Sequence, residues 1–202
     1  MSEPISIGVT GTGGLGTHIL REISAAEGAE IAALADVSGK SLSAAAESFD
    51  VAEEHCYDDH LSMIDDRTLE GVIIATPHTF HYEQVIAALD REIDTLCEKP
   101  LCIDYTRAKE LVQRSEESQA TLMVGYQRHL MPAYRRARDE LSTQVGDPQF
   151  LTAEVTQDWI AHQEGSWRSN PDLSGGGQLY DTGSHLLDVV LWTSDLLSLI
   201  HI

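Results

Sequence analysis

Short apolar runs alternate with amphipathic stretches along the first half of the chain. The apolar run at 5–9 precedes a glycine-rich turn, and apolar residues then recur at helical spacing over 15–26. The same alternation predicts further strands at 30–35, 71–75, 95–97 and 122–125 and helices at 42–49, 80–89 and 105–118. Parallel strands need long crossovers that cover both faces of their sheet, so this order predicts an α/β domain built on a parallel sheet. We expect this domain to span residues 1–125.

The pattern changes after residue 125. We expect a helix at 132–141, a strand of alternating character at 149–157, a loop to 177 and a last helix at 181–192. A single strand cannot build a second sheet. Residues 126–196 are therefore expected to form the beginning of an incomplete α+β domain.

Composition narrows the class of protein. The 202 residues include 33 acidic and 13 basic side chains, and the net charge of -20 makes nucleic acid and anionic membrane poor partners. No apolar run approaches the roughly 18 residues of a membrane span, and the first residues lack the basic start of a signal peptide. The three cysteines, Cys56, Cys97 and Cys102, show no C-x-x-C spacing and are expected to be reduced thiols. A cytoplasmic protein is the expectation.

Only three of the basic residues are lysines, namely Lys40, Lys99 and Lys109. A strongly negative surface repels itself in dilute buffer and is screened at high salt. We interpret this composition as adaptation to a saline cytosol. The alternative is an acidic protein from an ordinary organism.

The turn after the first strand carries a glycine motif. Gly11, Gly13 and Gly16 satisfy G-x-G-x-x-G, with Leu15 inside it, and Asp36 lies 20 residues beyond Gly16. In a Rossmann dinucleotide-binding domain these glycines allow a tight turn, close approach of the pyrophosphate and close helix packing, while the helix N-terminus supplies amide donors. The later carboxylate binds the adenosine ribose, which favours NAD over NADP. The alternative is a glycine turn that binds no ligand.

Polar residues follow two of the later strands. Thr76 and Pro77 come after the strand at 71–75, and His81 begins the next helix, which suggests a capping or cofactor-flanking role for His81. His78 and His81 could suggest a metal, but no third ligand is indicated, so no metal site is predicted.

Glu98-Lys99-Pro100 follows the strand at 95–97 and should emerge at the carboxyl edge of the sheet, where the nicotinamide end of a cofactor would lie. Lys99 is therefore a candidate for chemistry. The alternative is an ordinary surface ammonium.

A second candidate group lies at the glycine-rich segment 174–185. Asp181 and His185 are four residues apart, and Asp188 follows in roughly the same direction on a helix, so a carboxylate could orient an imidazole that exchanges a proton. The alternative is that Asp181 only caps the helix and His185 only packs.

In the order and spacing of its sequence motifs, the chain resembles the glucose-fructose oxidoreductase and inositol dehydrogenase family, Gfo/Idh/MocA. The segments that carry the resemblance are the glycine motif, Ala75-Thr76-Pro77, Glu98-Lys99-Pro100, Gly125-Tyr126-Gln127-Arg128 and the segment from Ser174 to His185. The most specific elements are E-K-P and G-G-G-x-x-x-D-x-G-x-H, whereas the glycine motif is shared with unrelated dehydrogenases.

The resemblance implies Lys99, Asp181 and His185 as catalytic residues and a cis peptide bond at Lys99-Pro100. It implies cofactor contacts from Gly11, Gly13, Leu15, Gly16, Asp36, Thr76, Pro77, His81, Glu98, Lys99, Gln127, Trp167 and Arg168. Tyr126 and Arg128 are expected beside cofactor or substrate.

The activity implied is hydride transfer between NAD and a secondary alcohol of a sugar, polyol or inositol. His185 would take the hydroxyl proton, Lys99 would stabilise the reacting oxygen, and Asp181 would orient substrate or His185. The alternatives are an NAD-dependent glycosidase of the same family and a non-catalytic nucleotide-binding fragment.

Members of the family continue into a large open sheet that supports the substrate pocket and the oligomer interface. The chain ends before such a sheet, so we expect a truncated, inactive form of a homo-oligomeric protein. Residues 197–202 resemble the translation of a transposase adapter end, and we expect them to be a non-native tail.

Overall fold

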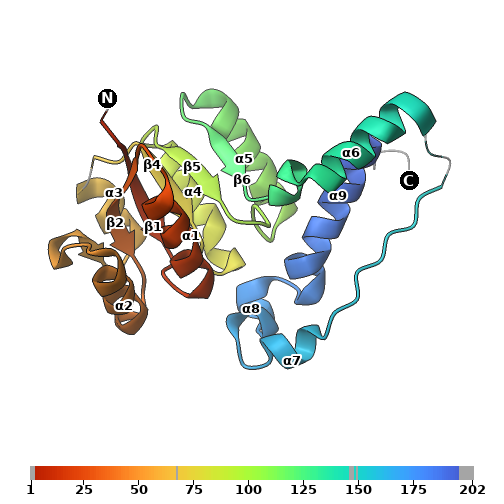
Figure 1. Ribbon diagram of the computed structural model, residues 1–202. Coiled ribbons are helices and arrows are strands. Elements are labelled where there is room, and N and C mark those ends of the chain that lie inside the picture. The colour runs from red at the N-terminus through yellow and green to blue at the C-terminus, as the bar shows by residue number, and fades with distance from the viewer. Residues whose placement is uncertain (1–2, 67, 146–147, 149, 196–202) are drawn as a thin grey trace. The chain divides into compact units, whose positions relative to one another are not determined.

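A computed structural model describes residues 3–66, 68–145, 148 and 150–195 (Figure 1). The chain forms two compact units, residues 1–124 and 125–202. The expectation of a non-native tail at 197–202 lies outside the described residues. Within the described ranges, no helix is long and apolar enough to cross a membrane.

The first unit is built on a six-stranded sheet. Its strands are β1 (Ile5–Thr10), β2 (Ala29–Ala35), β3 (Cys56–Tyr57), β4 (Gly71–Ile74), β5 (Asp94–Cys97) and β6 (Leu122–Val124). The strand order is β3-β2-β1-β4-β5-β6, and every neighbouring pair is parallel. The order reverses direction between β1 and β4, and ligands of such sheets bind outside the carboxyl ends of the strands at that point. The predicted parallel α/β domain is confirmed.

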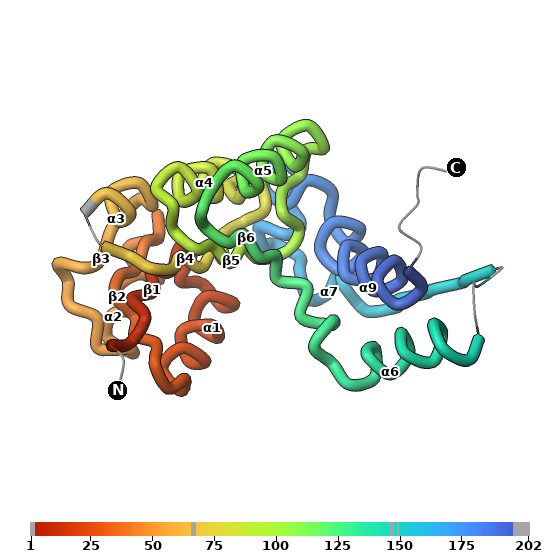
Figure 2. The backbone as a smooth tube through the Cα atoms, turned by 90° about the horizontal axis from the view of Figure 1, so that it is seen from above, coloured from red at the N-terminus to blue at the C-terminus, as the bar shows by residue number. Residues whose placement is uncertain are grey.

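Helices cover both faces of this sheet. They are α1 (Gly14–Ala25), α2 (Gly39–Phe49), α3 (His60–Asp66), α4 (His81–Leu89) and α5 (Tyr105–Glu117), with short 3-10 turns η1 (Glu53–His55) and η2 (His78–Phe80). Figure 2 shows α1 and α2 along one side of the sheet and α3, α4 and α5 along the other. Two apolar clusters fill these layers, one around Val9, Leu20 and Leu34 and the other around Met63, Ile74 and Leu111.

The second unit is helical. Its elements are η3 (Gln127–Leu130), α6 (Pro132–Glu140), η4 (Leu141–Val145), α7 (Trp159–Gln163), η5 (Trp167–Ser169), α8 (Pro171–Ser174), η6 (Leu179–Gly183) and α9 (Ser184–Ser194). Two of these, η4 and η6, are π-helical turns. Helices α6 and α9 lie side by side in both ribbon and tube views (Figures 1 and 2).

Two expectations for this unit are wrong. Residues 150–158 contain no strand, because alternation alone does not make a strand without a neighbouring strand to receive its backbone hydrogen bonds, and the sheet of the described residues lies entirely in the first unit. The expected helix at 181–192 begins instead as the π-helical turn η6, and regular α-helix starts only at Ser184.

Candidate active site

The glycine turn between β1 and α1 is shaped by close backbone contacts. Gly11 has a φ of +85°, and a Cβ there would lie 2.7 Å from the Ala75 carbonyl. A Cβ at Gly16 would collide with the carbonyl oxygen of Gly11. A Cβ at Gly13 would meet nothing within 4 Å, so space remains open beside the turn.

The N-terminus of α1 faces this turn with its amide donors. Gly13 is the N-cap, and no side chain among the described residues caps it. Leu15 lies in the first turn of the helix. Backbone amides and the positive end of the helix dipole suit a pyrophosphate, so the geometry fits a dinucleotide.

Asp36 sits at the carboxyl end of β2, beside the glycine turn. One oxygen of its carboxylate accepts hydrogen bonds from Thr12 N at 2.6 Å and Thr12 Oγ1 at 3.0 Å, and the other accepts from Ser38 N at 2.8 Å. These bonds fix a negative charge next to the turn. A carboxylate there can accept from a ribose hydroxyl and repels a phosphate.

His81 is fully buried at the start of α4. Its Nδ1 lies 2.8 Å from Pro100 O and its Nε2 lies 2.9 Å from Thr76 O. Its ring therefore joins the end of β4 to the turn that carries Lys99. The N-cap of α4 is Phe80, without a side-chain hydrogen bond, so His81 does not cap α4, although its backbone N–H caps the end of η2.

Burial is the largest influence on the His81 imidazole and lowers its pKa, against the two carbonyl contacts, which raise it. The His78 ring lies edge-on to it, with ring centroids 5.7 Å apart. Among the residues that the structure describes, no group of three or more His, Cys, Asp or Glu side chains could hold a metal ion.

Lys99 lies two residues beyond the end of β5, in the turn at the carboxyl edge of the sheet. The Lys99-Pro100 peptide bond is cis, which confirms that expectation. Glu98 N donates to Ile74 O at 2.9 Å, so the turn is tied to the end of β4, where Thr76 and Pro77 follow. The Lys99 amide donates to a carboxylate oxygen of Glu98 at 3.3 Å.

Asp181 belongs to the second unit, in the π-helical turn η6. Its side chain is 11% exposed and accepts hydrogen bonds from Trp159 Nε1 at 3.0 Å and Arg168 Nε at 3.3 Å. The Arg168 guanidinium lies over the Trp167 ring, with its central carbon 4.4 Å from the ring centroid. Arg168 and Trp167, predicted from the resemblance, are thus grouped with Asp181, and Trp159 is a member that the sequence analysis missed.

His185 lies in the first turn of α9, where the Tyr126 ring meets its imidazole edge-on at a centroid separation of 6.1 Å. Asp188, expected to share a face with His185, has its carboxylate 2.8 Å from Nε2 of His129. Burial raises the pKa of Asp188, while the neighbouring His129 lowers it.

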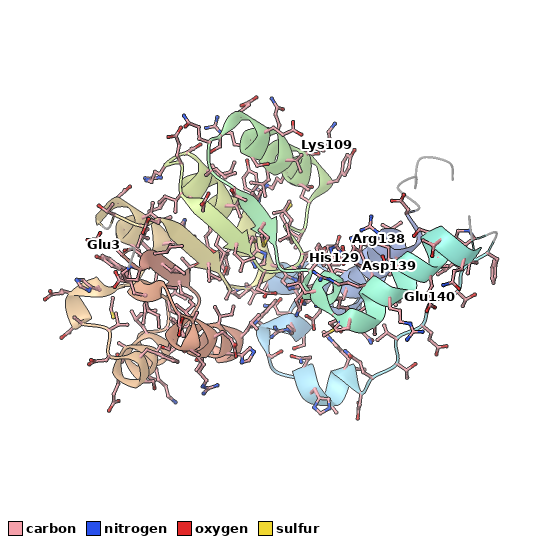
Figure 3. The ribbon with its side chains drawn as sticks, turned by 45° about the horizontal axis from the view of Figure 1, so that its top comes forward. Glu3, Lys109, His129, Arg138, Asp139 and Glu140 are labelled. Carbon is pink, nitrogen blue, oxygen red and sulfur yellow. The ribbon has the colours of Figure 1, made fainter. Side chains whose placement is uncertain are left out.

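The His129 ring also stacks on Trp192, with centroids 4.4 Å apart, and the Arg138 guanidinium lies over the same indole. Figure 3 labels His129 and Arg138 beside α9. This packing fixes the segment that begins with Tyr126, Gln127 and Arg128 against the helix that carries His185. His129 and Trp192 were not predicted as site residues.

Comparisons with known proteins agree with these features. The family model described as "Oxidoreductase family, NAD-binding Rossmann fold" matches residues 5–126, and that of the GFO/IDH/MocA C-terminal domain matches residues 134–197. A D-xylose 1-dehydrogenase [NADP(+)] from Haloarcula marismortui is 32% identical over 154 residues, which cover 74% of this chain and 42% of that protein. An inositol 2-dehydrogenase from Paracoccus denitrificans is 28% identical over 95% of this chain and 54% of its own length.

Solved structures show the same fold. An oxidoreductase domain protein from Kribbella flavida has a TM-score of 0.82 at 26% identity, covering 96% of this chain and 55% of that one. The scyllo-inositol dehydrogenase from Lactobacillus casei with bound NAD(H) and scyllo-inositol has a TM-score of 0.80 at 23% identity. The match covers 96% of this chain and 57% of that one. The chain spans about half the length of the curated relatives it matches. With a family model matched over more than half of its residues, the chain belongs to the Gfo/Idh/MocA oxidoreductase family.

Proposed function

We propose that the chain supplies the cofactor-binding and catalytic residues of a dehydrogenase that acts on a secondary alcohol of a sugar, polyol or inositol. The observation that carries this proposal is the grouping at the carboxyl edge of the sheet, where the glycine turn and Asp36 adjoin β1 and the Lys99 turn is tied to β4. The names of the relatives, a xylose dehydrogenase and inositol dehydrogenases, support a polyhydroxylated substrate.

The proposed cofactor is NAD rather than NADP. A nicotinamide cofactor supplies hydride chemistry, and the residues proposed to hold it are those predicted in the sequence analysis, with Asp36 on the ribose. One similar protein is named for NADP(+), so the preference of this chain rests on the Asp36 carboxylate. Fluorescence titration of the chain with NADH and NADPH tests it: tighter NADH binding is expected, and equal or tighter NADPH binding would contradict the proposal.

Three residues are proposed to act on the alcohol. His185 accepts the hydroxyl proton, Lys99 donates a hydrogen bond to the reacting oxygen, and Asp181 orients the neighbouring hydroxyl groups. General acid-base catalysis of this kind typically increases the reaction rate by about 10²- to 10⁴-fold.

Replacing Lys99 or His185 by alanine tests these roles. In a full-length version of the protein, each variant should lower turnover of myo-inositol or D-xylose by at least about 10²-fold while NADH affinity changes little, because both groups act at the hydroxyl. Exposed His18 offers a matched control, and His18→Ala should keep wild-type turnover. Net reduction of NAD separates this activity from glycoside cleavage that returns its hydride, and NADH binding without turnover would favour a nucleotide-binding role.

The domain limits, the oligomeric state and the cellular compartment are also proposals. Residues 1–125 would bind the cofactor, 126–196 would contribute the substrate side, and the whole protein would be a homo-oligomer. The cytoplasm is the proposed compartment, because it holds the nicotinamide pool and keeps thiols such as Cys56, Cys97 and Cys102 reduced.

A further inference from the structure

The Asp181 carboxylate receives hydrogen bonds from two segments outside its own turn. Oδ2 accepts from Nε1 of Trp159, the first residue of α7, and Oδ1 accepts from Nε of Arg168 in η5. The side chain is 11% exposed, so these contacts form where water screens little.

The turn that carries Asp181 is held by the segment 157–159. Gln157 Nε2 donates to Thr182 Oγ1 at 2.7 Å, next to the bond between Trp159 and Asp181. The Trp159 ring also lies over Gly177, 3.6 Å from the position of a Cβ there. Single π-helical turns such as η6 are rare and are frequent at functional sites. Two consecutive residues of this turn are therefore fixed by one short segment of chain.

We propose that Trp159 is a positioning residue: its indole N–H fixes the orientation of the Asp181 carboxylate, and with it the direction in which that carboxylate meets a hydroxyl group of a polyol substrate. The inference rests on the proposed function, in which Asp181 orients substrate. It adds a residue that the sequence motifs do not assign.

The geometry explains why the indole is needed. A guanidinium can bind both oxygens of a carboxylate through its parallel N–H groups. Arg168 is already beside Asp181 and is steadied by the Trp167 ring. Without the competing indole donor, the carboxylate would turn toward Arg168 and lose its alignment with a substrate hydroxyl, and a misplacement of about 1 Å can cost on the order of 10² in rate.

A double-mutant cycle tests the inference. Trp159→Phe keeps an aromatic side chain and removes the indole donor, while Asp181→Ala removes both carboxylate acceptors. In a full-length version of the protein, with NAD and either myo-inositol or D-xylose, Trp159→Phe should lower kcat/KM by about 10-fold or more and leave NADH affinity within about twofold. In the Asp181→Ala background, Trp159→Phe should cause no further loss. Ile160, 73% exposed on the same helix, provides the control, and Ile160→Ser should behave as wild type.

The outcomes separate the inference from the proposed function. Equal losses from Trp159→Phe in both backgrounds, or no loss in the wild-type background, would overturn the positioning role. Full turnover by Asp181→Ala would instead remove Asp181 from the proposed mechanism.

Urea unfolding of the same four proteins gives a readout that needs no turnover. The two substitutions should be coupled by about 10-fold in the unfolding equilibrium constant, as for a hydrogen bond to a charged group. Additive effects on unfolding would show that the indole does not hold the carboxylate, and would overturn the inference in the absence of any substrate.

Discussion

The His81 imidazole faces a carbonyl oxygen on each side, Pro100 O and Thr76 O. A neutral imidazole carries one N–H and can donate to only one of them, whereas the charged ring could donate to both. Burial nevertheless dominates and lowers the pKa of His81. The ring is therefore kept neutral in the folded chain at pH values where an exposed histidine would already be protonated.

This shift predicts a loss of stability in mild acid. In the unfolded chain histidine titrates near a pKa of about 6.5. Between that value and the lower pKa of folded His81, the unfolded chain binds a proton that the folded chain does not, so the free energy of unfolding falls as pH falls. The slope from one proton is at most about 1.4 kcal/mol per pH unit. Urea unfolding between pH 7.5 and pH 5 measures it.

Two variants identify the residue responsible. His81→Asn should have a flatter pH dependence than wild type, whereas replacing the exposed His18 by asparagine should leave the slope unchanged. A wild-type slope that His81→Asn does not alter would assign the acid sensitivity to other groups, of which half-buried His60, whose pKa is also lowered mainly by burial, is the first candidate.

Residues that act through local geometry could be predicted from the sequence. The glycine turn, Asp36 and Lys99 each follow directly from the end of a buried strand, so their place at the carboxyl edge was predictable. Trp159 could not be found this way. Its partner lies 22 residues further along the chain, and only the folded second unit shows that its indole reaches Asp181.

At the scale of elements, prediction succeeded where burial makes the pattern strong. Strands β1 and β2 are apolar runs on either side of α1, as expected for parallel strands covered on both faces. Strand β3 has two residues and α3 has seven, too few to show a period, and both were missed. The prediction of a strand at 149–157 was wrong although its polar and apolar residues alternate clearly. An alternating segment forms a strand only where another strand is present to pair with it.

The connection between β1 and α1 predicts a sharp difference between two glycines. A Cβ at Gly16 would collide with the Gly11 carbonyl oxygen, a backbone atom that cannot move aside without opening the turn. Gly16→Ala should therefore lower the free energy of unfolding by about 1–3 kcal/mol and weaken NADH binding. At Gly14, the first residue of α1, a Cβ would meet nothing within 4 Å, so Gly14→Ala is a matched control that should not destabilise the fold. Equal stability of the two variants in urea would contradict this account of the motif.

At the scale of the whole molecule, charge is the dominant feature. The net charge is -20, and the chain has only three lysines, Lys40, Lys99 and Lys109. Arginine takes part in ion pairs such as Arg91 with Asp65, Arg114 with Asp90 and Arg136 with Glu140. Pairs on the surface contribute at most about 1 kcal/mol each, so they offset little of the repulsion among the excess carboxylates.

We therefore predict that salt stabilises the chain. The Debye length falls from about 10 Å at 0.1 M to about 3 Å at 1 M, and repulsion among exposed carboxylates should be screened over that range. Each kcal/mol recovered raises Tm by roughly 2–4 °C for a chain of this size. Thermal unfolding in KCl from dilute buffer to 3 M measures the effect, and a flat or falling Tm would contradict salt adaptation.

The dependence of Tm on KCl concentration separates two causes of stabilisation. Screening should raise Tm steeply at low salt and then level off, whereas exclusion of salt from the protein surface should continue to raise Tm at high salt. Sucrose at zero added salt is the control, because it strengthens burial by exclusion without screening charge, and it should not reproduce the early steep rise.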